Sequence, residues 1–307
     1  MTGLDIRSIH DDAELALALA IHNALEPDDM LAVADVKAFI SQAAEHEGYL
    51  AWRAGAAVGM ARASLLHDHA EPLVDVRVLR DHRRCGIGTS LFDCASRWVR
   101  GRGHDTVEVW VEDRDPAGIE FATTRGFGEV AREIRVVLDL RASTPPVAAP
   151  PDGVHIVTWA ERPDLAGGIY EVVVEASPDI PGEEDSPVPP FERWLTDDMR
   201  GHGDRPEATF VALHGGDVIG FSKFSLTTAQ PTTAHHDLTG VKRAWRGRGV
   251  ARALKSAQIE WARRNGYERL VTRNEERNAP IRRVNEEFGY KPDSARILMR
   301  GPISAAT

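Results

Sequence analysis

The stretch that decides the fold is Val241-Lys-Arg-Ala-Trp-Arg-Gly-Arg-Gly-Val-Ala-Arg-Ala-Leu254. A related stretch occurs earlier in the 307-residue chain, as Val78-Leu-Arg-Asp-His-Arg-Arg-Cys-Gly-Ile-Gly-Thr-Ser-Leu91. The two are offset by 163 residues, which places Arg83 at the position of Arg246. A constant offset between two such stretches indicates an internal repeat.

The similarity continues downstream of both stretches. In each copy a helical segment leads into a β-rich run, Thr106–Val111 in the first copy and Arg269–Thr272 in the second, and then into a short helix. The short helices end at Gly126-Phe127 and Gly289-Tyr290, again at an offset of 163 residues. The repeat therefore covers about 50 residues and predicts two copies of one structural unit.

Upstream of the two stretches the copies agree more loosely. Tyr49–Arg53 and Val58–Leu66 read as the strands of a hairpin, as do Thr209–Leu213 and Val218–Leu226. At the repeated stretch itself the order strand, helix, strand requires one parallel crossover. We therefore expect two α+β domains, each a mixed, mostly antiparallel sheet flanked by helices.

A segment rich in proline and small residues divides the chain near its middle. Residues 143–152 cannot continue a helix or a central strand and read as a linker. The sequence thus predicts an N-terminal domain over residues 1–142 and a C-terminal domain over residues 153–307.

Composition and charge exclude several classes of protein. The hydrophobic fraction is 42% and the charged fraction 27%, as in soluble globular proteins. No apolar run approaches the roughly 20 residues that span a bilayer, and no secretory signal opens the chain. The net charge of −10 argues against nucleic-acid binding, and Cys85 and Cys94 do not resemble a disulfide framework or a metal site. We expect a cytoplasmic protein with no metal, membrane or nucleic-acid partner.

Charge is segregated in the second half of the chain. Residues 151–240 carry a balance of −11, whereas residues 241–307 carry +9. One part then suits a cationic ligand and the other an anionic one. Chance clustering of solvated charges is the alternative.

The repeated stretches place glycines between a strand and a helix. Glycine allows a tight turn there, and the N–H groups at the start of the helix then favour an anion such as a diphosphate. Neither copy has the third glycine of a dinucleotide-binding fingerprint or the Gly-Lys-Ser/Thr of a P-loop. A purely structural helix start is the alternative for either copy alone.

Both copies resemble the GNAT superfamily of acyl-CoA N-acyltransferases, whose signature is Val-x-x-x-x-Arg-x-x-Gly-x-Gly/Ala. Asn278–Tyr290 and Asp115–Phe127 match part of its second signature, Asn-x-x-Ala-x-x-x-Tyr-x-x-x-Gly-Phe. Two such domains in one chain resemble the mycothiol synthase-like, two-domain acetyltransferases of actinobacteria.

The resemblance implies direct transfer of an acetyl group from acetyl-CoA to an amine, with pantetheine along a strand over residues 235–241 that splays from its neighbour at 269–273. In the C-terminal copy the implied cofactor-binding residues are Val241, Lys242, Arg246, Gly247, Arg248, Gly249, Val250, Ala251, Asn278 and Arg283. In the N-terminal copy they are Val78, Arg83, Arg84, Gly86 and Gly88.

Proton transfer is harder to assign. The tyrosine that acts as the acid in many relatives is replaced by Asn285 in the C-terminal copy and by Ala122 in the N-terminal copy. Asn285 can donate a hydrogen bond but cannot act as an acid, so we expect it to position the thiolate and water to supply the proton. Ala122 can do neither, so we expect the C-terminal domain to be the catalyst and the N-terminal domain to be degenerate. Strand alternation puts Asp237 on the face of Val241, which makes Asp237 the preferred base, with His235 or His236 as rivals.

The acceptor amine is expected near the acidic segment that contains Glu183, Glu184 and Asp185, which can attract a cation. Phe191 and Trp194 wall a pocket there or, alternatively, belong to the core of a short helix. The implied substrate is the primary amine of a small cationic or polar metabolite. Other hypotheses are a non-catalytic acyl-CoA sensor and a protein lysine acetyltransferase. In each case we expect the chain to be a monomer or a homodimer.

Overall fold

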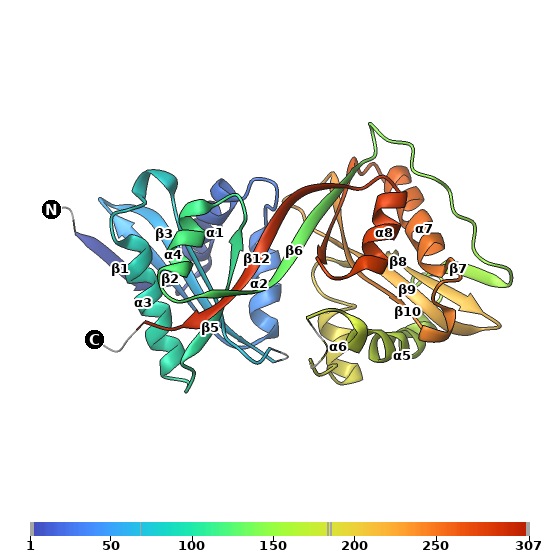
Figure 1. The fold of residues 1–307 in the computed structure, drawn as a ribbon, viewed down its shortest axis with the longest axis horizontal. Coiled ribbons are helices and arrows are strands. Elements are labelled where there is room, and N and C mark those ends of the chain that lie inside the picture. The colour runs from blue at the N-terminus through green and yellow to red at the C-terminus, as the bar shows by residue number, and fades with distance from the viewer. Residues whose placement is uncertain (1–2, 68, 183, 185, 305–307) are drawn as a thin grey trace. The chain divides into compact units, whose positions relative to one another are not determined.

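The computed structural model describes residues 3–67, 69–182, 184 and 186–304. The chain forms two compact units, each of which contains one sheet with its helices (Figure 1). Unit 1 comprises Met1–Ala131 together with Arg296–Thr307, and unit 2 comprises Arg132–Ala295. The expected fold class is confirmed in both units.

Unit 1 has the sheet order β1-β2-β3-β4-β5-β12, in which β4 and β5 are the parallel pair. Its elements are β1 (Leu4–Ser8), α1 (Asp12–Leu25), α2 (Val33–Gln42), β2 (Ala43–Arg53), β3 (Ala56–Leu66), β4 (Leu73–Val78), the 3₁₀ helix η1 (Arg80–His82), α3 (Ile87–Arg100), β5 (Thr106–Glu112), α4 (Pro116–Thr123) and β12 (Lys291–Pro302).

Unit 2 repeats this arrangement with the sheet order β6-β11-β10-β9-β8-β7, and β10 and β11 are its parallel pair. Its elements are β6 (Gly128–Asp139), β7 (Val154–Thr158), η2 (Pro163–Leu165), α5 (Ala166–Ala176), η3 (Ser177–Asp179), α6 (Phe191–Asp197), β8 (Asp204–His214), β9 (Asp217–Leu226), β10 (Thr233–Val241), η4 (Arg243–Trp245), α7 (Val250–Arg264), β11 (Arg269–Glu275) and α8 (Ala279–Glu287).

The last strand of each sequence repeat completes the sheet of the other unit. β6 pairs with β11 from Glu133 to Asp139, and β12 pairs with β5 from Arg296 to Pro302. The compact units therefore differ from the expected division at residues 143–152. β5 and β11 occupy equivalent positions in the two repeats. Either strand can therefore pair with the strand that follows its own short helix or with the strand that follows the short helix of the other repeat.

Helix α7 shows how the sequence positions the repeated turn. Gly249 precedes the helix in a left-handed conformation, with φ of 91°, which glycine adopts without strain. Val250, Leu254 and Ala257 then recur at intervals of four and three residues and pack in one cluster with Phe210 and Phe224 of the sheet. The opposite face of the same sheet packs against α5 and α6. Among the described residues, no helix has the length and apolar character needed to cross a membrane.

Candidate active site

The parallel strands of unit 2 separate after three residue pairs. β10 pairs with β11 only from Thr233 to His235, although β10 continues to Val241. The N–H of Lys242 donates to the carbonyl of Ile219 at 2.9 Å, so alternation turns the N–H of Val241 away from β9. The expected splay is present, and it leaves one edge of β10 free to pair with an extended ligand.

The turn between β10 and α7 presents a row of backbone donors. Gly247 and Gly249 have φ angles of 72° and 91°. Among the described residues, the N–H groups of residues 247–252 have no hydrogen-bond acceptor. Free N–H groups at the positive end of a helix suit a phosphate, so this turn fits the diphosphate of a coenzyme A derivative.

The arginine of the repeated signature contacts the end of the strand that precedes the turn. Nε of Arg246 donates to the carbonyl of Val241 at 3.0 Å, and its Nη1 lies 2.7 Å from Asp179. In unit 1, Arg83 donates to the carbonyl of Val78 at the same distance. Both arginines therefore hold the end of the strand in place, and their contact with phosphate stays a prediction.

The other predicted cofactor residues lie in or near the turn, and no single atom is contacted by all of them. Lys242 lies 2.9 Å from Glu171, and Arg248 stacks over Trp245 with 5.1 Å to the ring centroid. Asn278 precedes α8, whereas Val250 is buried and Ala251 is partly buried at the start of α7. Arg283 on α8 has no ion pair or hydrogen bond among the described residues, so its guanidinium remains free for a ligand.

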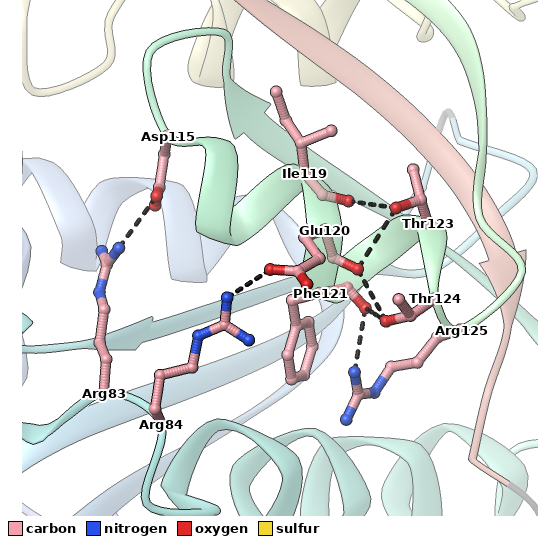
Figure 2. Close-up of polar contacts among 9 residues, drawn as sticks. All are labelled: Arg83, Arg84, Asp115, Ile119, Glu120, Phe121, Thr123, Thr124 and Arg125. Atoms are coloured by element: carbon pink, nitrogen blue, oxygen red, sulfur yellow. Dashed lines mark hydrogen bonds and ion pairs between the residues drawn. The ribbon is translucent and has the colours of Figure 1, made fainter.

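The equivalent turn of unit 1 is bound by its own carboxylates. Arg83 lies 2.9 Å from Asp115, and Arg84 forms an ion pair with Glu120 of α4 (Figure 2). Arg84 has a left-handed φ of 61° at the position that Gly247 occupies in unit 2. Gly86 and Gly88 complete this turn, and Gly86 is left-handed as well.

Five of the matched positions in and beside the two turns show the contrast in charge, although Arg252 of unit 2 also pairs with Glu287 at 2.5 Å. At the offset of 163, unit 2 carries a charge of +3 and unit 1 a charge of −1 at these positions. The pairs are Gly247 with Arg84, Arg248 with Cys85, Arg252 with Thr89, Asn278 with Asp115, and Arg283 with Glu120. The turn of unit 2 is thus the one whose charge suits an anion.

Asp237 belongs to a network around a buried lysine that the sequence reasoning did not find. The Asp237 side chain is 44% exposed and lies 2.7 Å from Nζ of Lys223, which itself is 5% exposed. Nζ of Lys223 also lies 2.7 Å from Asp204 and donates to the carbonyl of Asp198. Burial lowers the pKa of Lys223, but Asp237 and Asp204 outweigh it and hold that pKa above its usual value.

A β-bulge changes the predicted faces of the strand. The pairing of β10 with β9 shifts between His236 and Thr239. Asp237 contacts Lys223 and Leu238 packs in the cluster under α5, whereas Val241 packs in the cluster under α7. The expectation that Asp237 shares a face with Val241 is therefore wrong, because the extra residue of a bulge interrupts alternation. Asp237 instead faces the side of α5 and α6.

Asp198, directly after α6, lies within electrostatic range of Asp237. Burial of its carboxyl raises the pKa of Asp198 to about 6, against the opposing charge of Lys223, and the charge of Asp237 raises it further. A carboxyl that titrates near neutral pH is suited to accept a proton. Sequence spacing gave no signal for Asp198, because it belongs to a different element.

The two histidines have different environments. Nε2 of His235 lies 2.8 Å from Oε1 of Gln230, and the residue is partly exposed. His236 is buried, with Nδ1 at 3.1 Å from Oε1 of Gln258 and Nε2 bonded to the hydroxyl of Tyr290. Burial lowers the pKa of His236 well below its usual value. His235 is thus the more accessible of the two rival bases.

Asn285 is buried at the former tyrosine position. Its Nδ2 donates to Oδ1 of Asn274 on β11 at 2.7 Å, and its own Oδ1 has no partner among the described residues. Ala122, its equivalent in unit 1, is also buried. A positioning role for Asn285 stays a prediction.

The acidic segment of unit 2 is partly described. The carboxylate of Glu184 accepts from the N–H of Gly182, whereas Glu183 and Asp185 lie outside the described residues. Phe191 and Trp194 contact Tyr170, and Trp194 is buried in the cluster under α5. These two aromatic residues therefore belong to the core of unit 2.

Known proteins resemble this chain over most of its length. The model of the acetyltransferase (GNAT) family matches residues 13–127 and 168–290. A mycothiol acetyltransferase of Catenulispora acidiphila is 29% identical over 234 residues, which are 74% of this chain and 71% of that protein. Another, of Nocardiopsis dassonvillei, is 25% identical over 270 residues, 79% of this chain and 78% of that protein.

Solved structures share the whole fold. A tandem GNAT protein from the clavulanic acid biosynthesis pathway has a TM-score of 0.81 at 22% identity, over 99% of this chain and 100% of its own. A GCN5-related N-acetyltransferase from Sphaerobacter thermophilus has a TM-score of 0.78 at 21% identity, over 99% of this chain and 97% of its own. The chain belongs to the GNAT acetyltransferase family, contains two copies of its domain in tandem, resembles mycothiol synthase, and is an acyltransferase.

Proposed function

We propose that unit 2 binds acetyl-CoA and transfers its acetyl group to the primary amine of a small cationic or polar metabolite, and that unit 1 does not catalyse this transfer. The observation that carries the proposal is the difference in charge between the two turns, +3 in unit 2 and −1 in unit 1 at matched positions. The charge at the turn of unit 2 attracts a diphosphate, whereas the charge at the turn of unit 1 repels it.

In this proposal the backbone at residues 247–252 and Arg283 hold the diphosphate, and the free edge of β10 holds the extended arm. Acetyl-CoA supplies an activated thioester. Asp237 takes a proton from the attacking ammonium, directly or through water, and Lys223 fixes the position of its carboxylate. Asp198 supports proton uptake because the pKa of its carboxyl is about 6.

We place the acceptor amine on the side of α5 and α6, where several acidic residues lie. Asp237, Asp198 and Glu184 favour an approaching ammonium group. The two relatives are named for mycothiol, so an amino-sugar thiol precursor belongs in the acceptor panel beside polyamines and aminoglycosides.

A transfer assay tests the proposal. The chain is incubated with acetyl-CoA and the amine panel, and thiol release is followed while calorimetry measures acetyl-CoA binding. Turnover of at least one small amine is expected. Binding without turnover on any amine would favour an acyl-CoA sensor, and turnover only on lysines of proteins would favour a protein acetyltransferase.

A further inference from the structure

Unit 2 contains a polar cluster inside its core, between α7, β10 and the segment after α8. Lys255 on α7 is 2% exposed, and its Nζ lies 5.1 Å from the ring centroid of Tyr290. The hydroxyl of Tyr290 is bonded to Nε2 of His236, whose Nδ1 lies 3.1 Å from Oε1 of Gln258. We call Lys255, His236, Gln258 and Tyr290 the apex cluster.

Two groups of the apex cluster lack a protein partner. Among the described residues, Nζ of Lys255 has no ion pair or hydrogen bond, and Nε2 of Gln258 is buried without an acceptor. The titratable groups beside Lys255 are His236 and Tyr290, and neither supplies a negative charge at neutral pH. Burial alone lowers the pKa of Lys255 to about 7. The cluster thus holds a surplus of hydrogen-bond donors.

Unit 1 shows that the fold does not require this polarity. At the offset of 163, apolar residues replace all four members of the apex cluster, and three of them form part of one apolar core. Lys255 corresponds to Phe92, His236 to Leu73, Gln258 to Ala95 and Tyr290 to Phe127. Nearby, Asn285, Asn274 and Thr272 correspond to Ala122, Val111 and Val109. Buried polar groups without partners are unfavourable for folding, so their presence in unit 2 points to a use in function.

The apex cluster lies where the strands of unit 2 begin to separate. His235 is the last residue of β10 that pairs with β11, and His236 is the next residue. From His236 to Val241 the free edge is about 16 Å long at roughly 3.3 Å per residue. If the phosphates of coenzyme A bind at residues 247–252, its pantetheine arm runs along this edge and its sulfur lies toward the apex cluster.

We propose that Lys255 donates the proton that the sulfur of coenzyme A takes as it leaves, the part that the missing tyrosine plays elsewhere in the family. This inference rests on the proposed function of unit 2. As the carbon–sulfur bond breaks, its electron pair goes to sulfur, and Lys255 transfers a proton from Nζ to that sulfur. Lys255 is left as a neutral amine, and solvent reprotonates it before the next turnover. Tyr290, whose ring lies 5.1 Å from Nζ, is a positioning residue, and His236 and Gln258 act through Tyr290 by the hydrogen bonds described above.

The test combines a binding readout with a kinetic one. Lys255→Met removes the donor, and Phe92→Met makes a matched change at the equivalent position of unit 1. Calorimetry compares coenzyme A with desulfo-coenzyme A, which lacks the thiol. The unchanged protein and Phe92→Met should bind coenzyme A about tenfold more tightly than the desulfo analogue, because Lys255 stabilises the thiolate. Lys255→Met should bind both equally.

The kinetic readout follows the pH dependence of kcat. In the unchanged protein kcat should fall as pH rises above about 7, because the donor loses its proton. Lys255→Met should lower kcat by about 100-fold and remove that decline. A quadruple variant with the residues of unit 1, Lys255→Phe, His236→Leu, Gln258→Ala and Tyr290→Phe, should fold, bind coenzyme A and lose activity.

The outcomes separate the two claims. If Lys255→Met keeps the preference for coenzyme A over the desulfo analogue and keeps the pH profile, the role of Lys255 is wrong while the proposed function stands. If the unchanged protein binds no coenzyme A in unit 2, the proposed function fails and this inference fails with it.

Discussion

At the scale of single residues, the two units differ in the charge of the side chain that α4 or α8 places beside the turn. Glu120 of unit 1 binds Arg84, whereas Arg283 of unit 2 has no protein partner among the described residues. The same position therefore neutralises one turn and adds positive charge to the other. This contrast could have been found from the sequence, by comparing the repeats position by position at the offset of 163.

Arg283→Glu should weaken acetyl-CoA binding about tenfold, or about 1.4 kcal/mol, because it gives unit 2 the charge that unit 1 has at this position. Calorimetry measures the dissociation constant. Arg282→Glu on the same helix makes an equal change in net charge, and its side chain bonds the carbonyl of Glu276. Equal effects of the two substitutions would show that overall charge, not the position of Arg283, sets the affinity.

Asp237→Asn should lower kcat about 100-fold and leave the dissociation constant of acetyl-CoA unchanged, because the amide cannot accept the proton of the acceptor ammonium. Lys223 keeps Asp204 as a buried partner, so unit 2 should still fold. Asp217→Asn, at the exposed first residue of β9, is the control. An unchanged kcat would remove Asp237 as the base.

The stability of unit 2 should depend on Lys255 at alkaline pH. The pKa of Lys255 is about 7 in the folded unit and 10.5 in the unfolded chain, so between these values the unfolded chain holds a proton that the folded unit lacks. The free energy of unfolding should therefore rise with pH across this window by up to a few kcal/mol, with no contribution to the slope below it. Denaturation at about pH 7 and about pH 9 should show this rise in the unchanged protein. A rise of the same size in Lys255→Met would mean that other groups cause it.

At the scale of elements, the sequence predicted the strands, helices and crossovers of each unit well, because glycine turns and periodic apolar residues mark them. It did not predict the partner of β6 or β12. Both repeats present equivalent strands, β5 and β11, and local sequence carries no information about which one a following strand will join. It also missed the bulge in β10 that turns Asp237 toward α5 and α6, because strand alternation assumes unbroken pairing.

Removal of residues after Ala295 should destabilise unit 1 and leave unit 2 folded, because Arg296–Pro302 pair with β5. Hydrogen exchange would show loss of protection in β5 and retained protection in β10 and β11. Loss of protection in β11 with β5 intact would instead indicate that β12 completes the sheet of its own repeat.

At the scale of the whole molecule, duplication has produced two units with one fold and different interiors. Unit 1 has an apolar core at the place of the apex cluster and a turn bound by its own acids. Unit 2 has a polar interior in which Nε2 of Gln258 and Oδ1 of Asn285 are buried without a partner among the described residues. We therefore propose a structural role for unit 1 and a catalytic role for unit 2.

A crystal structure of the chain with coenzyme A tests this division of roles most directly. We expect one coenzyme A per chain, with its diphosphate at residues 247–252 and its arm along β10. Coenzyme A at residues 84–89 of unit 1, with the turn of unit 2 empty, would contradict the account.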